Sequence, residues 1–370
     1  MARYAPAPMS ARTSDPALRM RRQSISVTTL VRARDQLDRF GPDAALDPGA
    51  KNAVQRCLRI TEGEQVVIVT HDESAPIAAA LMRAARGAGA QVTAVVTSLE
   101  EASSERFVDR LIAELAPAHA SFLVATLDGL PIELRRRVAD VEGSARRHGH
   151  MIGITRAMME QAMRADCDEV QRLTDRVMQR MRPGAQVEVR APGGTELRLT
   201  LDPSCRACGA SGVLTSPGWT NLPGGEVFAV PSTVDGVVVP DAGAWMPEGA
   251  ELPLAQRLTL TIERGVVVRV DGPSEPAARL TAVLDAHPGA RRVGQLGVGT
   301  NTGVLAPIGA LLQDLKLPGV HLTLGHTCPE LTGARFDAPV EIPLMVRRAS
   351  LTIDGEPVLT SGKYPPSLRV

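Results

Sequence analysis

The feature that most constrains the fold is an alternation of short apolar runs with helical patterns between residues 47 and 181. The apolar runs are rich in Val and Ile and are continuous, which is typical of strands covered on both faces in a parallel sheet. Strands are predicted at residues 65–70, 91–97, 121–125 and 151–155, with helices at 76–86, 105–115 and 132–148. Such alternation predicts βαβ units with right-handed crossovers.

The pattern changes after Gly184, where alternating apolar and polar residues replace the continuous runs. This alternation predicts antiparallel hairpins at residues 186–190 with 196–201, 258–263 with 266–270, and 350–353 with 356–359. Helices are expected at 166–181 and 276–286. The predicted fold class is therefore α/β: an N-terminal open parallel α/β domain followed by a β-rich α+β C-terminal domain. The expected bounds are a poorly ordered leader at 1–46, then domains at 47–184 and 185–370.

Composition excludes several classes of function. Lys and Arg total 41, as do Asp and Glu, so the net charge is zero, which argues against nucleic-acid binding. Aromatic residues are 2% of the chain, too few for base-stacking surfaces. The sequence has no run of roughly 18 apolar residues that would span a membrane. Five scattered cysteines indicate a reducing compartment. We therefore expect a cytoplasmic protein that acts on a small molecule or peptide.

Glu226 is the first candidate for chemistry. It follows Gly224 and Gly225 and precedes an apolar run, so a carboxylate stands at the start of a predicted strand, beside backbone that leaves room for a ligand. Such a position suits a metal ligand or a general base. The alternative is a surface glutamate on a turn, and composition alone leaves both open.

The richest group of ligand-type residues lies near residue 320. His321, His326, Cys328 and Glu330 fall within ten residues. If residues 320–324 form a strand, His321 and Thr323 share one of its faces. Imidazole and thiolate are standard ligands for zinc and similar metals. The alternative is a core histidine whose hydrogen bonds are satisfied.

Three other features have structural explanations. The glycine-rich residues 293–303 lack the order of a dinucleotide-binding fingerprint and predict a tight turn. Cys205 and Cys208 form a single C-x-x-C pair, best interpreted as free thiols. Residues 70–74 follow a predicted strand at the end where open α/β sheets bind ligands, but Ser74 also suits a helix N-cap.

Taken in order, residues 63–70 (GEQVVIVT), 221–228 (NLPGGEVF), 295–301 (QLGVGTN) and 321–325 (HLTLG) resemble the aminopeptidase T family over about residues 50–365. The resemblance implies an N-terminal α/β domain, a β-rich C-terminal domain holding two divalent metals, and a homodimer. A distant branch with a similar scaffold includes 2,5-dihydroxypyridine dioxygenase, a mononuclear iron enzyme that cleaves a ring.

The resemblance is carried over residue by residue. Glu226 and His321 match family ligands, whereas Gln295 stands where the family has a second glutamate, and Cys328 where it has a tyrosine. Glu341 falls in the stretch that should hold a closing H-x-D motif. We therefore expect Glu226 and His321 to lie together, in a metal site that uses His326, Cys328 or Glu341 as further ligands, with Gln295 orienting water or substrate.

The resemblance implies a divergent metal-dependent hydrolase, a metalloprotease-like aminopeptidase that uses zinc, manganese or cobalt to activate water against an amide bond. Two alternatives stay open. One is a metal-free scaffold or binding protein of a biosynthetic pathway, and the other is a mononuclear iron ring-cleaving dioxygenase.

Overall fold

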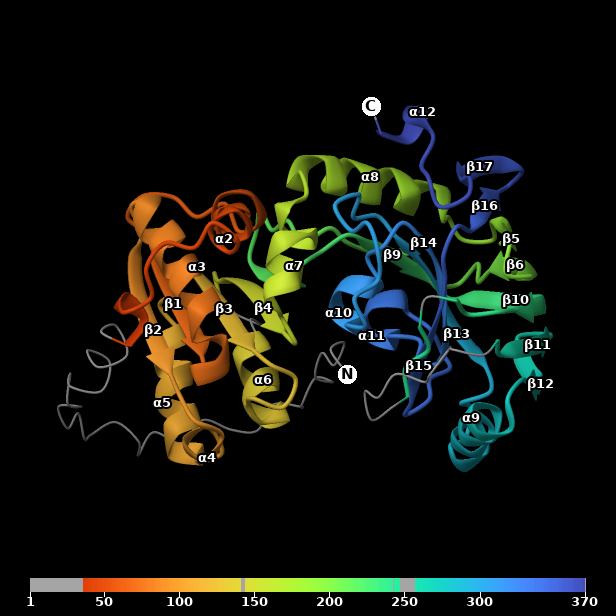
Figure 1. The fold of residues 1–370 in the computed structure, drawn as a ribbon, viewed down its shortest axis with the longest axis horizontal. Coiled ribbons are helices and arrows are strands. Elements are labelled where there is room, and N and C mark those ends of the chain that lie inside the picture. The colour runs from red at the N-terminus through yellow and green to blue at the C-terminus, as the bar shows by residue number, and fades with distance from the viewer. Residues whose placement is uncertain (1–35, 141–143, 242, 247–256, 370) are drawn as a thin grey trace. The chain divides into compact units, whose positions relative to one another are not determined.

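The structure, a computed structural model, describes residues 36–140, 144–241, 243–246 and 257–369 (Figure 1). These residues form two compact units. The N-terminal unit comprises the described residues up to Ile154, with Leu214–Trp219 added. The C-terminal unit comprises Thr155–Val213 and the described residues of Thr220–Val370. The domain bounds expected from the sequence, at 46 and 184, stay a prediction about which segments fold on their own.

The N-terminal unit is built on a sheet with the strand order β2-β1-β3-β4-β8. Its strands are β1 (Gln65–Thr70), β2 (Gln91–Val96), β3 (Ala120–Ala125) and β4 (Arg147–Ile152), with β8 (Gly218–Asn221), of which Gly218 and Trp219 belong to this unit. Strands β1 to β4 pair in parallel, as predicted. The predicted bounds of the fourth strand were wrong. The helix before it ends at Ala139, not at residue 148, and β4 begins at Arg147, not at residue 151. The first half of β4 contains two histidines, and local pattern gives no sign that both are buried.

Helices cover this sheet. They are α2 (Asp47–Asn52), α3 (Ala75–Gly87), α4 (Leu99–Ala102), α5 (Glu105–Leu115) and α6 (Ile132–Ala139), with a π-helical segment at Ala53–Cys57 and a 3-10 turn at Asp72–Ser74. Helices α5 and α6 pack in one apolar cluster with alternate residues of β1 and β3, while α3 contacts β1 and β2. Within the expected leader, Leu37 and Leu46 are buried, and residues 1–35 lie outside the described part.

The C-terminal unit contains two antiparallel sheets. The seven-stranded sheet has the order β12-β11-β10-β6-β5-β16-β17, and the five-stranded sheet has the order β15-β14-β13-β9-β7. The first uses β5 (Gln186–Arg190), β6 (Glu196–Leu201), β10 (Pro231–Val238), β11 (Thr259–Glu263), β12 (Val266–Asp271), β16 (Ser350–Ile353) and β17 (Glu356–Leu359). The second uses β7 (Cys208–Ala210), β9 (Glu226–Ala229), β13 (Val293–Gly299), β14 (Gly319–Gly325) and β15 (Glu341–Val346). The predicted α/β fold class is confirmed.

The helices of this unit are α7 (Arg156–Glu160), α8 (Cys167–Arg180), α9 (Ser274–Ala286), α10 (Leu311–Asp314), α11 (Pro329–Thr332) and α12 (Pro366–Arg369), with a turn at Ala162–Arg164. Asp166 caps α8 by accepting hydrogen bonds from two backbone N–H groups. The glycine-rich run expected to form a tight turn instead forms the central strand β13, where the missing side chains let neighbouring chain segments approach.

One apolar core joins the two sheets. Alternate residues of the five-stranded sheet, such as Val227, Leu296 and Leu322, pack in the same cluster as Val189 and Leu199 of the seven-stranded sheet. Because successive side chains of a strand point to opposite faces, the residues between them lie on the far face of the five-stranded sheet. That far face carries the candidate polar residues. Among the residues that the structure describes, no helix combines the length and apolar character needed to cross a bilayer.

Candidate functional site

Strands β9, β13 and β14 bring Glu226 and His321 together. Glu226 pairs across from Gly299, and His321 across from Gly297, so both side chains rise on the same face of the sheet. His321 Nε2 lies 3.0 Å from Glu226 Oε1, and both residues are 2% exposed. Ninety-five residues of sequence separate the two, and the strand register removes that separation.

Gly297 makes room for this imidazole. A Cβ atom at position 297 would lie 1.8 Å from His321 Nε2, so the ring lies directly over the glycine backbone. Gly225 acts similarly one residue before Glu226. Its φ is +111°, a conformation open mainly to glycine, and a Cβ there would lie 2.6 Å from Asn301 Cβ. The glycines of both sequence motifs therefore serve the packing around Glu226 and His321.

A third side chain, which sequence reasoning missed, completes this group. The Lys316 ammonium donates to Glu226 Oε2, and Lys316 is 3% exposed. We call Glu226, Lys316 and His321 the buried triad. The available signal was the rarity of lysine, since the sequence has only three, and this one stands between two leucines.

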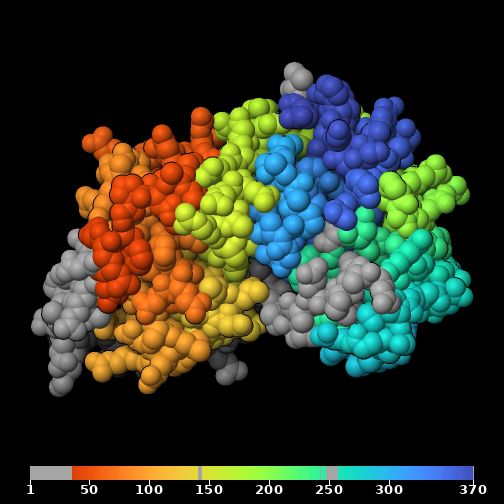
Figure 2. Space-filling view, in the orientation of Figure 1, coloured from red at the N-terminus to blue at the C-terminus, as the bar shows by residue number. Residues whose placement is uncertain are grey.

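Part of residues 300–318 lies on the face of the sheet that carries the buried triad, since a Cβ at Gly299 would lie 2.0 Å from the carbonyl oxygen of Leu317. Strand β13 leads into this segment, which returns to β14 and is tied down by side chains such as Asp314, whose carboxylate accepts from the N–H groups of Ile308 and Ala310 at 2.9 and 3.0 Å. Leu311 and Leu315 pack with Trp245 and Met345 on the same side. Figure 2 shows the neighbourhood of α10 as a continuous blue surface on the viewed face.

The buried triad does not fit a bound metal. Glu226 and His321 direct their polar atoms at each other, and Glu226 also accepts from an ammonium group. On the next strand, the residue opposite His321 is Met345, and the residue opposite Thr323 is Pro343. Glu341 stands opposite Gly325 and is half-buried. The expected ligands Glu226 and His321 are thus adjacent to each other, but their arrangement is that of an ion-pair network.

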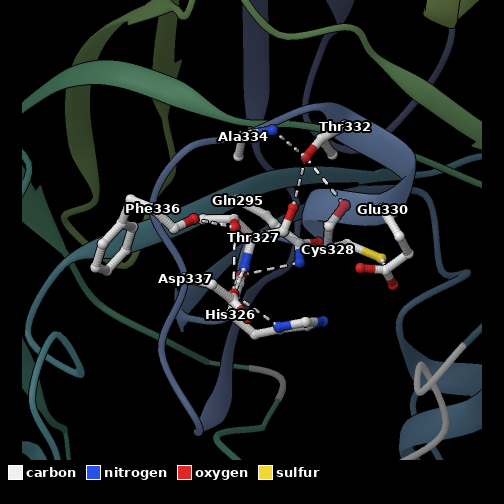
Figure 3. Close-up of polar contacts among 9 residues, drawn as sticks. All are labelled: Gln295, His326, Thr327, Cys328, Glu330, Thr332, Ala334, Phe336 and Asp337. Carbon is white, nitrogen blue, oxygen red and sulfur yellow. Dashed lines mark hydrogen bonds and ion pairs between the residues drawn. The ribbon is translucent and has the colours of Figure 1, made fainter. Parts of the chain in front are cut away.

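A second group lies just beyond the end of β14. Ligand atoms of His326, Cys328 and Glu330 all lie within 4.8 Å of one another (Figure 3). Cys328 Sγ lies 3.2 Å from Glu330 Oε1. Cys328 is buried, His326 is half-buried, and Glu330 is exposed. We call these three residues the loop cluster.

Hydrogen bonds fix His326 of the loop cluster. Its Nδ1 lies 2.9 Å from Asp337 Oδ1, and Gln295 Nε2 donates to its carbonyl oxygen at 2.9 Å (Figure 3). Histidines that ligate metals commonly pass their other ring N–H to a carboxylate in this way. Gln295 thus holds this loop backbone, and its expected role in orienting water or substrate stays a prediction. Asp337 was missed by sequence reasoning because nothing in the pattern tied it to His326.

Cys328 adopts an unusual backbone conformation, with φ of 56°. A left-handed conformation in a residue other than glycine is uncommon and concentrates at functional sites. Thr332 Oγ1 donates to the carbonyls of Thr327 and Cys328, each at 3.0 Å, and so holds the turn. An imidazole, a thiol and a carboxylate on one fixed loop with an exposed edge form a set that fits a single metal ion with open coordination positions.

The N-terminal unit contains a separate cavity of about 520 Å³ at the carboxyl ends of β1, β2 and β3. His71 lines it, and His71 Nε2 accepts from the N–H of Thr126 at 3.0 Å. Burial lowers the pKa of His71. Ser74, considered as an N-cap, contacts His71 Nε2 at 3.2 Å and makes no capping bond. Neither Cys205 nor Cys208 forms a disulfide in the structure.

Comparisons with known proteins place this architecture. No protein of curated function matches the sequence. The fold is shared with 2,5-dihydroxypyridine dioxygenase from Pseudomonas putida KT2440, with a TM-score of 0.63 and 18% identity, over 88% of this chain and 99% of that one. It is also shared with wild-type AmpT from Thermus thermophilus, with a TM-score of 0.60 and 18% identity, over 86% and 98%.

The expected likeness to aminopeptidase T therefore holds for the fold, but the family match points to the other branch. The family model for 2,5-dihydroxypyridine 5,6-dioxygenase, NicX, matches residues 49–305, more than half of the sequence. The chain belongs to the NicX family of 2,5-dihydroxypyridine 5,6-dioxygenases.

Proposed function

We propose that this protein is a single-metal enzyme that oxidises a small hydroxylated ring with dioxygen, and that the loop cluster holds its metal ion. The family match supports the class of reaction. The observation that carries the proposal is the convergence of His326, Cys328 and Glu330, whose ligand atoms lie within 4.8 Å of one another. Three protein ligands are the number that non-haem iron oxygenases use.

Each residue of the proposed site has a defined task. Asp337 accepts a hydrogen bond from the Nδ1–H group of His326, which leaves Nε2 as the ligating nitrogen. Gln295 and Val340 hold the backbone of His326, at 2.9 and 2.8 Å, and so fix the ring's starting point. Cys328 would provide a thiolate ligand from the buried side of the metal ion. Glu330 would provide a carboxylate from the exposed side, where a small molecule can reach the ion. A redox-active metal supplies, when bound, the electron chemistry that a ring substrate needs to react with dioxygen.

The donor set also favours a second candidate function. One imidazole, one thiolate and one carboxylate replace the two imidazoles and one carboxylate typical of iron oxygenases, and thiolate prefers zinc. A zinc ion at the loop cluster would lower the pKa of a bound water towards neutrality and so support hydrolysis. Cys328 and the AmpT-like fold favour this candidate, a hydrolase acting on an amide of an amino-acid-like molecule.

Metal analysis of protein purified without chelator, followed by two assays, separates the candidates. Near-stoichiometric iron with oxygen uptake on adding 2,5-dihydroxypyridine supports the oxygenase. Zinc with hydrolysis of a leucine amide, and no oxygen uptake, supports the hydrolase. Protein that binds neither metal contradicts both.

Ligand assignment has its own test. His326→Ala and Cys328→Ser should each lose bound metal, whereas the matched changes His287→Ala and Cys208→Ser should keep it. X-ray absorption should show a sulfur neighbour at about 2.3 Å from the metal. Metal bound only by nitrogen and oxygen would mean that Cys328 is not a ligand.

A further inference from the structure

The ammonium group of Lys316 lies against the carboxylate of Glu226, which also contacts the His321 ring. We infer that Lys316 takes the place of a metal ion beside Glu226 and His321, so that this face of the five-stranded sheet carries a covalently tethered cation and binds no metal. This inference concerns a different group from the loop cluster and does not depend on the proposed function.

Burial is the first support. Lys316 is 3% exposed and Glu226 2%, and charged side chains are almost never buried so completely unless they are paired. Lysine is also the suitable residue for this position. Its ammonium is a compact point charge, whereas the guanidinium of arginine is planar and broad. The chain uses lysine only three times among 41 basic residues, and one of the three stands here.

The backbone around Lys316 is fixed, so the ammonium is built into the fold. The Lys316 carbonyl accepts from the N–H of Asn301 at 3.0 Å, and its own N–H donates to Gln313 O at 2.8 Å. The Asn301 side chain in turn donates to the carbonyl of Gly224 at 2.9 Å, two residues before Glu226. Asn301 therefore links the backbone segments that carry the lysine and the glutamate.

A divalent ion would have to displace this ammonium and leave it buried without its carboxylate. That cost falls on the protein whenever a metal enters, so the intact pair excludes metal from Glu226. Removing the ammonium alone would leave a buried carboxylate and an imidazole 3.0 Å apart. Carboxylate and imidazole together are suitable ligands for zinc or manganese.

The test compares Lys316→Met with the wild type by equilibrium dialysis against Zn²⁺ and against Mn²⁺. We expect Lys316→Met to bind one equivalent more than the wild type. The double variant Lys316→Met with Glu226→Gln should lose that increment, because it lacks the carboxylate. A Lys316→Met protein that folds and gains no metal would overturn the inference.

Two further measurements keep the test decisive. If Lys316→Met does not fold alone, adding Zn²⁺ or Mn²⁺ should restore its near-ultraviolet circular dichroism, and failure to do so counts against the inference. The charge-balanced double variant should contain as much metal as the wild type, and a lower content would place metal at Glu226 in the wild type. None of these measurements uses His326→Ala, which tests the loop cluster. Failure of the proposed function can therefore be distinguished from failure of this inference.

Discussion

Two imidazoles five residues apart have opposite surroundings. His321 lies within β14, is 2% exposed, and meets a carboxylate that already holds an ammonium. His326 follows the strand directly, has a side chain that is 14% exposed, and contacts Asp337 at the edge of a loop with a cysteine and a second carboxylate. Under the two proposals, a histidine beside a carboxylate is not enough for a metal site. The deciding features would be whether a cation is already built in and whether one side is open.

The family match ends at residue 305, so it covers only some of the residues in these two groups. Glu226 and Gln295 lie inside the matched region, whereas Lys316, His321 and the loop cluster lie beyond it. Of the positions that depart from the expected ligand set, Gln295 lies inside the matched region, and Cys328 and Glu341 lie beyond it. The fold is held in common with the two solved structures, and the family match covers residues 49–305 of it.

The largest expected effect comes from unbalancing the buried triad. Lys316→Met leaves the Glu226 charge buried without its ammonium, and we expect it to lower the free energy of unfolding by about 3–5 kcal/mol in the presence of chelator. The double variant with Glu226→Gln should recover most of that loss. Urea denaturation measures both, and equal losses in the two variants would show that packing, not charge, is what Lys316 contributes.

Two buried imidazoles in the N-terminal unit can be compared with the imidazole of the buried triad. They contact a hydroxyl and each other, in place of a carboxylate that holds an ammonium. His148 Nδ1 lies 2.8 Å from Ser121 Oγ, and its Nε2 lies 3.3 Å from His150 Nδ1. Burial, then Arg135, lowers the pKa of His150 to about 4, and burial holds the pKa of His148 well below its usual value.

Acid should therefore destabilise the N-terminal unit. Below pH 6.5 the unfolded chain binds protons that the folded histidines do not, so stability falls as pH decreases from 6.5 towards 4. The His150 shift alone corresponds to about 3 kcal/mol at pH 4. Hydrogen exchange of β3 and β4 at pH 7 and pH 4.5 measures it, with His150→Asn as the control in which the dependence shrinks. Equal protection at both pH values would contradict the buried neutral assignment.

Two glycines of β13 allow the buried triad and the loop cluster to be perturbed one at a time. Gly297→Ala pushes into the His321 ring, and Gly294→Ala places a Cβ 2.3 Å from the carbonyl of His326. We expect each to cost about 1–3 kcal/mol of stability. Only Gly294→Ala should also lower metal content, because only it moves the loop cluster. Loss of metal in Gly297→Ala with none in Gly294→Ala would reverse the assignment of the two groups.

The smallest effect should come from Asp337→Asn. The amide still contacts His326 but no longer carries the charge that holds its Nδ1 proton, so we expect metal affinity to fall about 10–100-fold with stability unchanged. Competition with a chromogenic chelator gives the affinity. A matched Asp354→Asn variant, on an exposed turn, should leave affinity unchanged, and a similar fall there would point to a general electrostatic effect.

Most of the strands could be predicted from the sequence because the order of apolar and polar residues within each strand matches its burial. The runs that became β1, β3 and the three predicted hairpins have the continuous or alternating apolar character that their environments require. Strand β4 was misplaced because it reads Arg-His-Gly-His at its start, and local pattern gives no sign that the histidines are buried.

The candidate site was predicted in part. The ligand-rich stretch from His321 to Glu330 was visible because its members are close in sequence. Lys316 was not, since its partner Glu226 is 90 residues away, and the two meet only because the segment after β13 folds back, with the Asn301 N–H bonded to the Lys316 carbonyl. Asp337 was missed for a related reason: the turn that brings it to His326 depends on hydrogen bonds around Thr327 and Thr332.

The most direct test of this account is an anomalous-scattering map of crystals of the wild-type protein, recorded at the absorption edge of its bound metal. We expect one peak within bonding distance of His326 and Cys328, and no peak between Glu226 and His321. A peak between Glu226 and His321, with Lys316 turned away, would contradict it.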